Sequence, residues 1–187
     1  MSFIIMGCLA FIFLYIFDLN KVYHLHNGIN ICFALGIVLL AISTMGLLFA
    51  APESFPVYFP LRMIFGLLSA LSFFLILHAL FFALPFKKTY IETNNKNMVI
   101  DKGMYALCRH PGVLWFFLFY IFLWLASGKM TVLWAGLVWT LMDIIHVYVQ
   151  DRWLFPITLD GYDLYRERVP FLIPTFDSIK QFVITRK

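Results

Sequence analysis

Two ionisable residues lie inside an apolar stretch of the chain, and their spacing brings them to one side of a helix. Asp143 and His146 are three positions apart, and Trp139 and Gln150 continue the same face at steps of four. Ionisable groups within a membrane helix are costly and usually face a bundle interior or a water-filled cavity. This face therefore predicts either the lining of a pocket, with a base or an orienting pair, or a structural cluster whose members hydrogen-bond each other.

A second candidate stands where another apolar run begins. In the stretch GMYALCRHPGVLWFF, Arg109, His110 and Pro111 come shortly before the run that starts at Val113. A cation and an imidazole are costly at a membrane boundary, so their presence suggests that they hold something. Pro111 is suited to the first turn of the following helix, because its missing N–H does no harm there.

The tail carries a third pattern, in the stretch DGYDLYRERVP. Asp160 can cap a short helix that Pro170 ends. Tyr162, Tyr165 and Val169 would then share one face, which sets aromatic rings against another part of the protein. The alternative is an amphipathic helix that lies at the membrane interface, where Tyr and Arg are common.

Composition determines the class of protein that must position these residues. Of the 187 residues, 63% are hydrophobic and 13% are charged, and the mean hydropathy is +0.88. Soluble domains carry roughly 25% charged residues, so the chain is expected to be an integral membrane protein and a single domain. Its three cysteines are scattered with no C-x-x-C pair, and no ligand spacing typical of a metal site occurs.

Five apolar segments are long enough to be candidate membrane-spanning helices, since about 20 apolar residues cross the hydrocarbon core. The sequence therefore predicts an all-α helical bundle with about five transmembrane helices, followed by an amphipathic helix in the C-terminal tail that faces the cytosol. The predicted spans are Ser2–Phe17, Ile29–Ala51, Val57–Leu84, Val113–Ser127 and Thr131–Val149.

The distribution of basic residues predicts the orientation, because short cytoplasmic loops are rich in Lys and Arg. With the N-terminus outside, all basic residues except Arg62 and Lys129 fall on the inner side. The substantial polar sequence also lies there, in a loop from Lys87 to Pro111 and a tail from Gln150 onward. A pI near 9.0 follows from this topology, and no basic face or known fold suggests nucleic-acid binding.

The second half of the chain resembles a known family. The stretch MVIDKGMYALCRHPGVLWFF, a transmembrane hairpin and the stretch DGYDLYRERVPFLIP are similar to the C-terminal signature of isoprenylcysteine carboxyl methyltransferases and related phospholipid N-methyltransferases. In that family a G-x-Y-x-x-x-R-H-P motif precedes the hairpin, and a Glu-Glu pair, two tyrosines and two prolines follow it. The positions that match are Gly103, Tyr105, Arg109, His110, Pro111, Tyr162, Tyr165, Val169, Pro170 and Pro174.

The resemblance implies methyl transfer from S-adenosylmethionine, bound on the cytosolic side, to a lipid or a lipidated acceptor in the membrane. Residues 1–86 would form three N-terminal spans, and residues 87–187 would form the cofactor-binding half. Arg109 and His110 would donate to the cofactor's carboxylate. Asp143 and His146 are not part of the family signature. From their shared helix face we expect them to serve the acceptor side as a base or an orienting pair, and Arg109 is also counted among the expected catalytic residues. The implied cofactor-binding residues are Tyr105, Arg109, His110, Pro111, Gln150, Asp151, Tyr162 and Tyr165.

The chain also departs from the family pattern. Gln150 and Asp151 stand where the family has Glu-Glu, and Trp115 stands where a Gly is usual. These differences suggest an altered substrate. Two further hypotheses therefore stay open: a membrane reductase on a similar scaffold that uses a nicotinamide cofactor, and a membrane protein that kept the fold and lost the chemistry.

Overall fold

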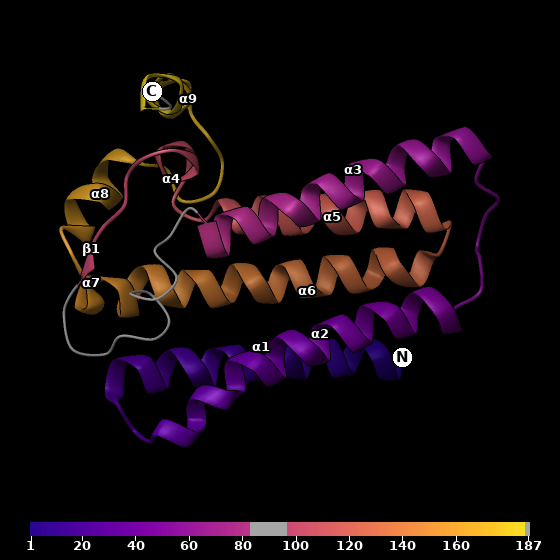
Figure 1. Cartoon of the computed structure of the whole chain (residues 1–187), viewed down its shortest axis with the longest axis horizontal. Helices are drawn as coiled ribbons and strands as arrows, with labels where there is room; N and C mark the ends of the chain where they lie inside the picture. Colours follow the sequence, from indigo (N-terminus) through magenta and orange to yellow (C-terminus); the bar gives the residue numbers. More distant parts are fainter. Residues whose placement is uncertain (83–96, 186–187) are drawn as a thin grey trace.

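Long helices that run alongside one another dominate the computed structural model, which describes residues 1–82 and 97–185 (Figure 1). The end of the predicted third span at Leu84 and much of the predicted inner loop lie outside these residues. The long helices are α1 (Ser2–Tyr23), α2 (Ile31–Ala50), α3 (Phe59–Leu77), α5 (Pro111–Ser127) and α6 (Met130–Val149).

Four helical stretches in the described residues are long and apolar enough to cross a membrane, as is typical of an integral membrane protein. They are Ser2–Tyr23, Asn27–Ala50, Phe59–Phe81 and Met130–Thr158. Helix α5 is apolar but shorter, at 17 residues. The all-α bundle is therefore confirmed, with short elements added at one end.

The helices pack as two pairs around α6. Helix α1 lies against α2, and α3 lies against α5, while α6 contacts both α1 and α5. Figure 1 shows α6 between the two pairs. The tight turn from α5 to α6 is possible because Gly128 adopts a positive φ of 68°.

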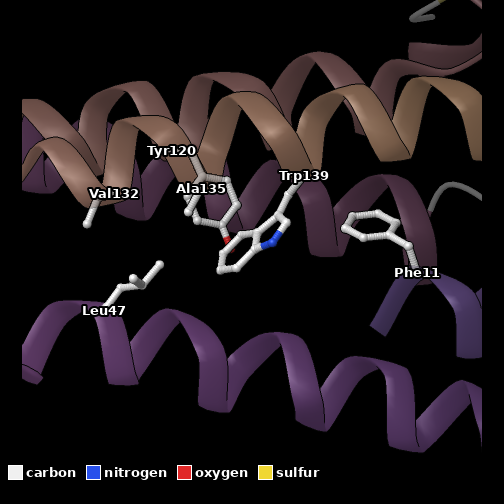
Figure 2. Packing of buried hydrophobic residues seen from close by; sticks show 6 residues of the cluster. All are labelled: Phe11, Leu47, Tyr120, Val132, Ala135 and Trp139. Carbon is white, nitrogen blue, oxygen red and sulfur yellow. The ribbon is translucent and has the colours of Figure 1, made fainter. Parts of the chain in front are cut away.

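Trp139 of α6 lies at the centre of the bundle and is fully buried (Figure 2). Its indole Nε1 donates to the carbonyl oxygen of Ile4 at 3.0 Å, and its ring lies 5.3 Å from that of Tyr120, centroid to centroid. The Tyr120 hydroxyl is 2.7 Å from the hydroxyl of Thr44. Gly7 allows α1 to approach, because a Cβ there would lie 2.2 Å from the indole. One aromatic pair thus joins α1, α2, α5 and α6.

The end of the bundle opposite the turn at Gly128 carries most of the short elements. Helix α6 continues through a π-helical turn, Gln150–Leu154, into α7 (Phe155–Thr158). Strand β2 (Leu159–Asp160) then pairs in parallel with β1 (Asn97–Met98). Helices α4 (Met104–Leu107), α8 (Tyr162–Arg168) and α9 (Phe176–Thr185) complete this polar end, as we call it below.

Two details differ from the sequence-based prediction. The first helix continues beyond Phe17 to Tyr23, because the polar residues that follow find partners at the polar end. Asp160 does not cap the tail helix: it belongs to β2, and Gly161 with φ of 80° precedes α8.

Candidate functional site

Arg109 and Asp151 form the centre of the candidate site. The guanidinium makes a two-pronged contact with the carboxylate, Nε to Oδ1 at 2.7 Å and Nη2 to Oδ2 at 3.1 Å. Their side chains are 9% and 8% exposed. Two planar groups in this arrangement form a strong, oriented ion pair, since both hydrogen bonds are charge-assisted. The pair joins the segment before α5 to the π-helical turn after α6.

The tail completes the coordination of Arg109. Its Nη1 donates to the backbone carbonyl oxygens of Arg166, at 2.9 Å, and Val169, at 2.5 Å. These carbonyls are free to accept because they lie in the last turn of α8 and just beyond it. A single cation therefore holds the π-helical turn after α6 and the end of α8 to the R-H-P segment.

Asp151 also accepts hydrogen bonds from two neutral groups. The Tyr162 hydroxyl donates to Oδ1 at 2.5 Å, and Nε2 of His110 lies 3.2 Å from the same oxygen. Because a carboxylate oxygen only accepts, the imidazole carries its proton on Nε2 in this contact. Oδ1 thus has three donors, whereas Oδ2 has one among the described residues.

Backbone contacts and aromatic rings set the position of the R-H-P segment. The Arg109 and His110 amides donate to the carbonyls of Pro170 and Phe171, at 2.9 and 3.3 Å. The Phe171 ring lies 5.6 Å from the guanidinium carbon and 5.1 Å from the imidazole, centroid to centroid. Pro111 starts α5, as predicted. Arg109 and His110 are therefore held against the tail through both backbone and ring contacts.

Two of the predicted tyrosines serve as ties between elements. The hydroxyl of Tyr165 donates to the backbone oxygen of Tyr105 at 2.7 Å. The hydroxyl of Tyr105 in turn donates to the carbonyl of Ala79 at 3.0 Å, in the π-helical turn His78–Phe82 that follows α3. These bonds link α8, α4 and the end of α3. Tyr162 contacts the ion pair directly, whereas the two other hydroxyls are bonded to backbone oxygens.

Burial controls protonation around the ion pair. It lowers the pKa of His110 and raises the pKa of Tyr162 and of Tyr165. Burial also raises the pKa of the Cys108 thiol to about 11. All four side chains are therefore neutral at physiological pH, and the charges at the centre are those of Arg109 and Asp151.

A second polar cluster lies where α1 meets the end of α6. Oδ2 of Asp18 is 2.6 Å from Nε2 of His146 and accepts from the Gln150 amide at 2.6 Å. Asp143 lies within electrostatic range of His146 but forms no hydrogen bond with a described residue. Asp143 and His146 therefore do not hydrogen-bond each other, and the partner of His146 comes from the first helix.

The two clusters use adjacent residues of one π-helical turn. Gln150 faces Asp18, and Asp151 faces Arg109, so the predicted pair of cofactor ligands is divided between them. A π-helical turn shifts the register of side chains and is often found at functional sites. His146 is also close enough to His110 to interact with it electrostatically.

Sequence reasoning missed Asp18 and the carbonyls of α8. Asp18 directly follows Phe17, the last residue of the predicted first span, and it lies on α1 because the helix continues to Tyr23. In the part of the chain that the structure describes, no group of three or more His, Cys, Asp or Glu could hold a metal ion. No model of a known protein family, no curated protein and no solved structure matches this chain.

Proposed function

We propose that this protein is a membrane methyltransferase that takes S-adenosylmethionine at its polar end and methylates a lipid or a lipidated acceptor. The observation that carries the proposal is the convergence of three separate segments on one buried ion pair. The R-H-P segment supplies Arg109 and His110, the π-helical turn after α6 supplies Asp151, and the tail supplies Tyr162.

The ion pair retains capacity for a zwitterionic ligand. A guanidinium has five N–H groups, and the bonds to described residues leave one N–H on Nη2. Oδ2 of Asp151 likewise keeps a lone pair beside it. A donor next to an acceptor suits the carboxylate and ammonium of an amino acid, which is one end of S-adenosylmethionine. The rings of Phe171, Phe155 and Tyr162 nearby suit its apolar parts.

In this proposal Arg109 and Asp151 bind and orient the cofactor, while neutral His110 and Tyr162 hold the Asp151 carboxylate in place. When bound, S-adenosylmethionine supplies an activated methyl group on a cationic sulfur. Transfer of that methyl group to a lone pair of the acceptor would leave the electron pair of the C–S bond on sulfur. Alignment of donor and acceptor supplies much of the rate in such a displacement.

In this proposal the second cluster, formed by Asp18, His146 and Gln150, acts on the methyl acceptor. A carboxylate acceptor needs no base, whereas an ammonium acceptor must lose a proton before it attacks. His146, oriented by Asp18 at 2.6 Å, could take that proton, with Asp143 one turn deeper in α6. This role for Asp143 and His146 is distinct from cofactor binding, so their substitution should lower turnover more than cofactor affinity.

We further propose a five-pass topology in which α5 is the additional span. The N-terminus would then be outside, and the polar end would face the cytosol, where S-adenosylmethionine is available. The distribution of basic residues supports this orientation. Lys129, one of the two exceptions, is bound at the opposite end, where its Nζ donates to carbonyls of Leu48 and Ala51.

Transfer of a radiolabelled methyl group tests the proposal. Membranes that contain the protein are incubated with labelled S-adenosylmethionine, and label is measured separately in extracted lipid and in protein. Wild type should give label in one fraction, and Asp151→Asn should abolish it. Arg62→Ala is the matched control, because Arg62 pairs with Glu53 far from the site and is well exposed. Wild-type label no higher than in membranes without the protein would argue against methyl transfer.

A further inference from the structure

Helix α9 is attached to the polar end but is not part of the bundle. It packs against α4. Its start is defined by reciprocal bonds: the Thr175 amide donates to the Ser178 hydroxyl at 2.9 Å, and the Ser178 amide lies 3.3 Å from the Thr175 hydroxyl. Ser178 is buried. Helix α9 is therefore a folded element with a defined side that contacts the protein.

The opposite side of α9 exposes a continuous apolar surface. Phe176, Ile179 and Val183 follow one another at helical steps of three and four, and they are 94%, 45% and 64% exposed. Lys180 borders this surface, and Asp177 lies on the polar side of the helix. We call these three apolar residues the α9 apolar face.

The orientation of α9 differs from that of the spanning helices. Figure 1 shows α9 nearly end-on, whereas the long helices run across the view. If the long helices cross the membrane, the axis of α9 lies parallel to the membrane surface. Its position beside α4, at the polar end, places it near the level where the spanning helices leave the bilayer.

We infer that α9 is an interfacial helix whose apolar face enters the acyl region of the inner leaflet and whose basic residues bind anionic phospholipid headgroups. Lys180 lies on the helix, and Arg186 and Lys187 follow it in the sequence, against one acidic residue, Asp177. A helix with a large apolar face and basic borders binds such a surface through both apolar burial and charge.

Because α9 packs against α4, the inferred contact of α9 with the membrane would also affect the R-H-P segment. The C-terminal end of α4 is two residues from Arg109, and Tyr105 of α4 binds both α8 and the end of α3. A membrane-bound α9 therefore anchors the segment that carries the R-H-P motif. This inference stands independently of methyl transfer, since it concerns where α9 lies and requires no cofactor.

Spin labels on the full-length protein test where the α9 apolar face lies. Single cysteines replace Ile179, Val183 or, as the matched control, Asp177, in a background with Cys8→Ala and Cys32→Ala. Cys108 can remain, because its thiol is buried and its pKa is raised to about 11, so it stays unreactive at neutral pH. The protein is reconstituted in vesicles of phosphatidylcholine and phosphatidylglycerol.

Relaxation by oxygen and by a water-soluble nickel chelate then reports the surroundings of each label. Labels at Ile179 and Val183 should be accessible to oxygen and protected from the chelate, with the reverse at Asp177. Chelate access at all three positions would overturn the inference. So would protection from both reagents with broadening between labels, because that pattern indicates contact with a second copy.

A charge change separates headgroup binding from apolar contact. Lys180→Glu should move the Val183 label toward water in vesicles that contain phosphatidylglycerol, whereas Lys180→Arg should leave it in place. Removal of phosphatidylglycerol from the vesicles should have the same effect as Lys180→Glu. An unchanged Val183 label in Lys180→Glu would refute the contribution of anionic headgroups.

Discussion

Replacement of Asp151 by alanine is expected to destabilise the fold strongly, because it leaves a buried cation without its counter-ion. The substitution removes the acceptor of four contacts, two from Arg109 and one each from His110 and Tyr162. With the Arg109 side chain 9% exposed, water cannot fully replace the carboxylate. The guanidinium keeps its bonds to two carbonyls, but these carry no charge to balance it.

The size of the effect follows from the burial of the pair. Removal of one partner from a buried ion pair costs about 3–5 kcal/mol of unfolding free energy. An exposed pair contributes about 0–1 kcal/mol. Arg62 and Glu53 offer the comparison within this chain, since they lie 3.0 Å apart with side chains 40% and 48% exposed. Asp151→Ala should therefore cost at least about three times as much as Glu53→Ala.

The assay is reversible unfolding in mixed detergent micelles with increasing dodecyl sulfate, followed by tryptophan fluorescence. A double variant, Arg109→Leu with Asp151→Leu, should recover part of the loss, because it removes the unpaired charge as well. If Asp151→Ala costs no more than Glu53→Ala, the pair is solvated in the protein, and the reasoning about the site is wrong.

Two further predictions concern packing and pH. Gly7→Ala should lower the free energy of unfolding by about 1–3 kcal/mol, because its Cβ would lie 2.2 Å from the Trp139 ring. Gly66→Ala is the control, because nothing lies within 4 Å of a Cβ added at Gly66. This variant should be slightly more stable than wild type, since Ala has a higher helix propensity than Gly. An equal loss of unfolding free energy in both variants would exclude a clash as the cause. Burial lowers the pKa of His110, so its protonation opposes folding. The stability that neutral His110 contributes should be fully present above about pH 6.5 and should be lost as the pH falls below that value. The free energy of unfolding is measured at about pH 7.5 and about pH 5. Its change between the two pH values should be smaller in His110→Gln than in wild type. An equal change in both proteins would show that His110 is not the group responsible.

The bundle itself could be predicted from sequence because its signal is local. Apolar runs of sufficient length identify spanning helices without any knowledge of their neighbours. Helix ends were less certain, since a polar residue such as Asp18 can end a span or continue a helix. Whether the helix continues depends on whether a residue distant in sequence binds that polar side chain, as His146 binds Asp18 here.

Part of the side-chain cluster at the candidate site could be anticipated from the sequence, but its pairings could not. Arg109, His110, Asp151 and Tyr162 lie together, which is the grouping that the family resemblance implied. The separation of Gln150 from Asp151 was not foreseeable, because a π-helical turn changes the direction of adjacent side chains, and its presence depends on tertiary contacts. The apolar face of α9 was not predicted, although its apolar residues recur at helical spacing. The predicted tail helix ended at Pro170, and α9 begins beyond it, at Phe176.

The most direct measurement is equilibrium binding of S-adenosylmethionine to the purified protein, by calorimetry in detergent, with a nicotinamide cofactor titrated in parallel. Wild type and Arg62→Ala should bind S-adenosylmethionine saturably and with equal affinity, and Asp151→Asn should lose binding while it remains monodisperse. Binding of the nicotinamide instead, or no binding of either ligand to a folded wild type, would contradict the account.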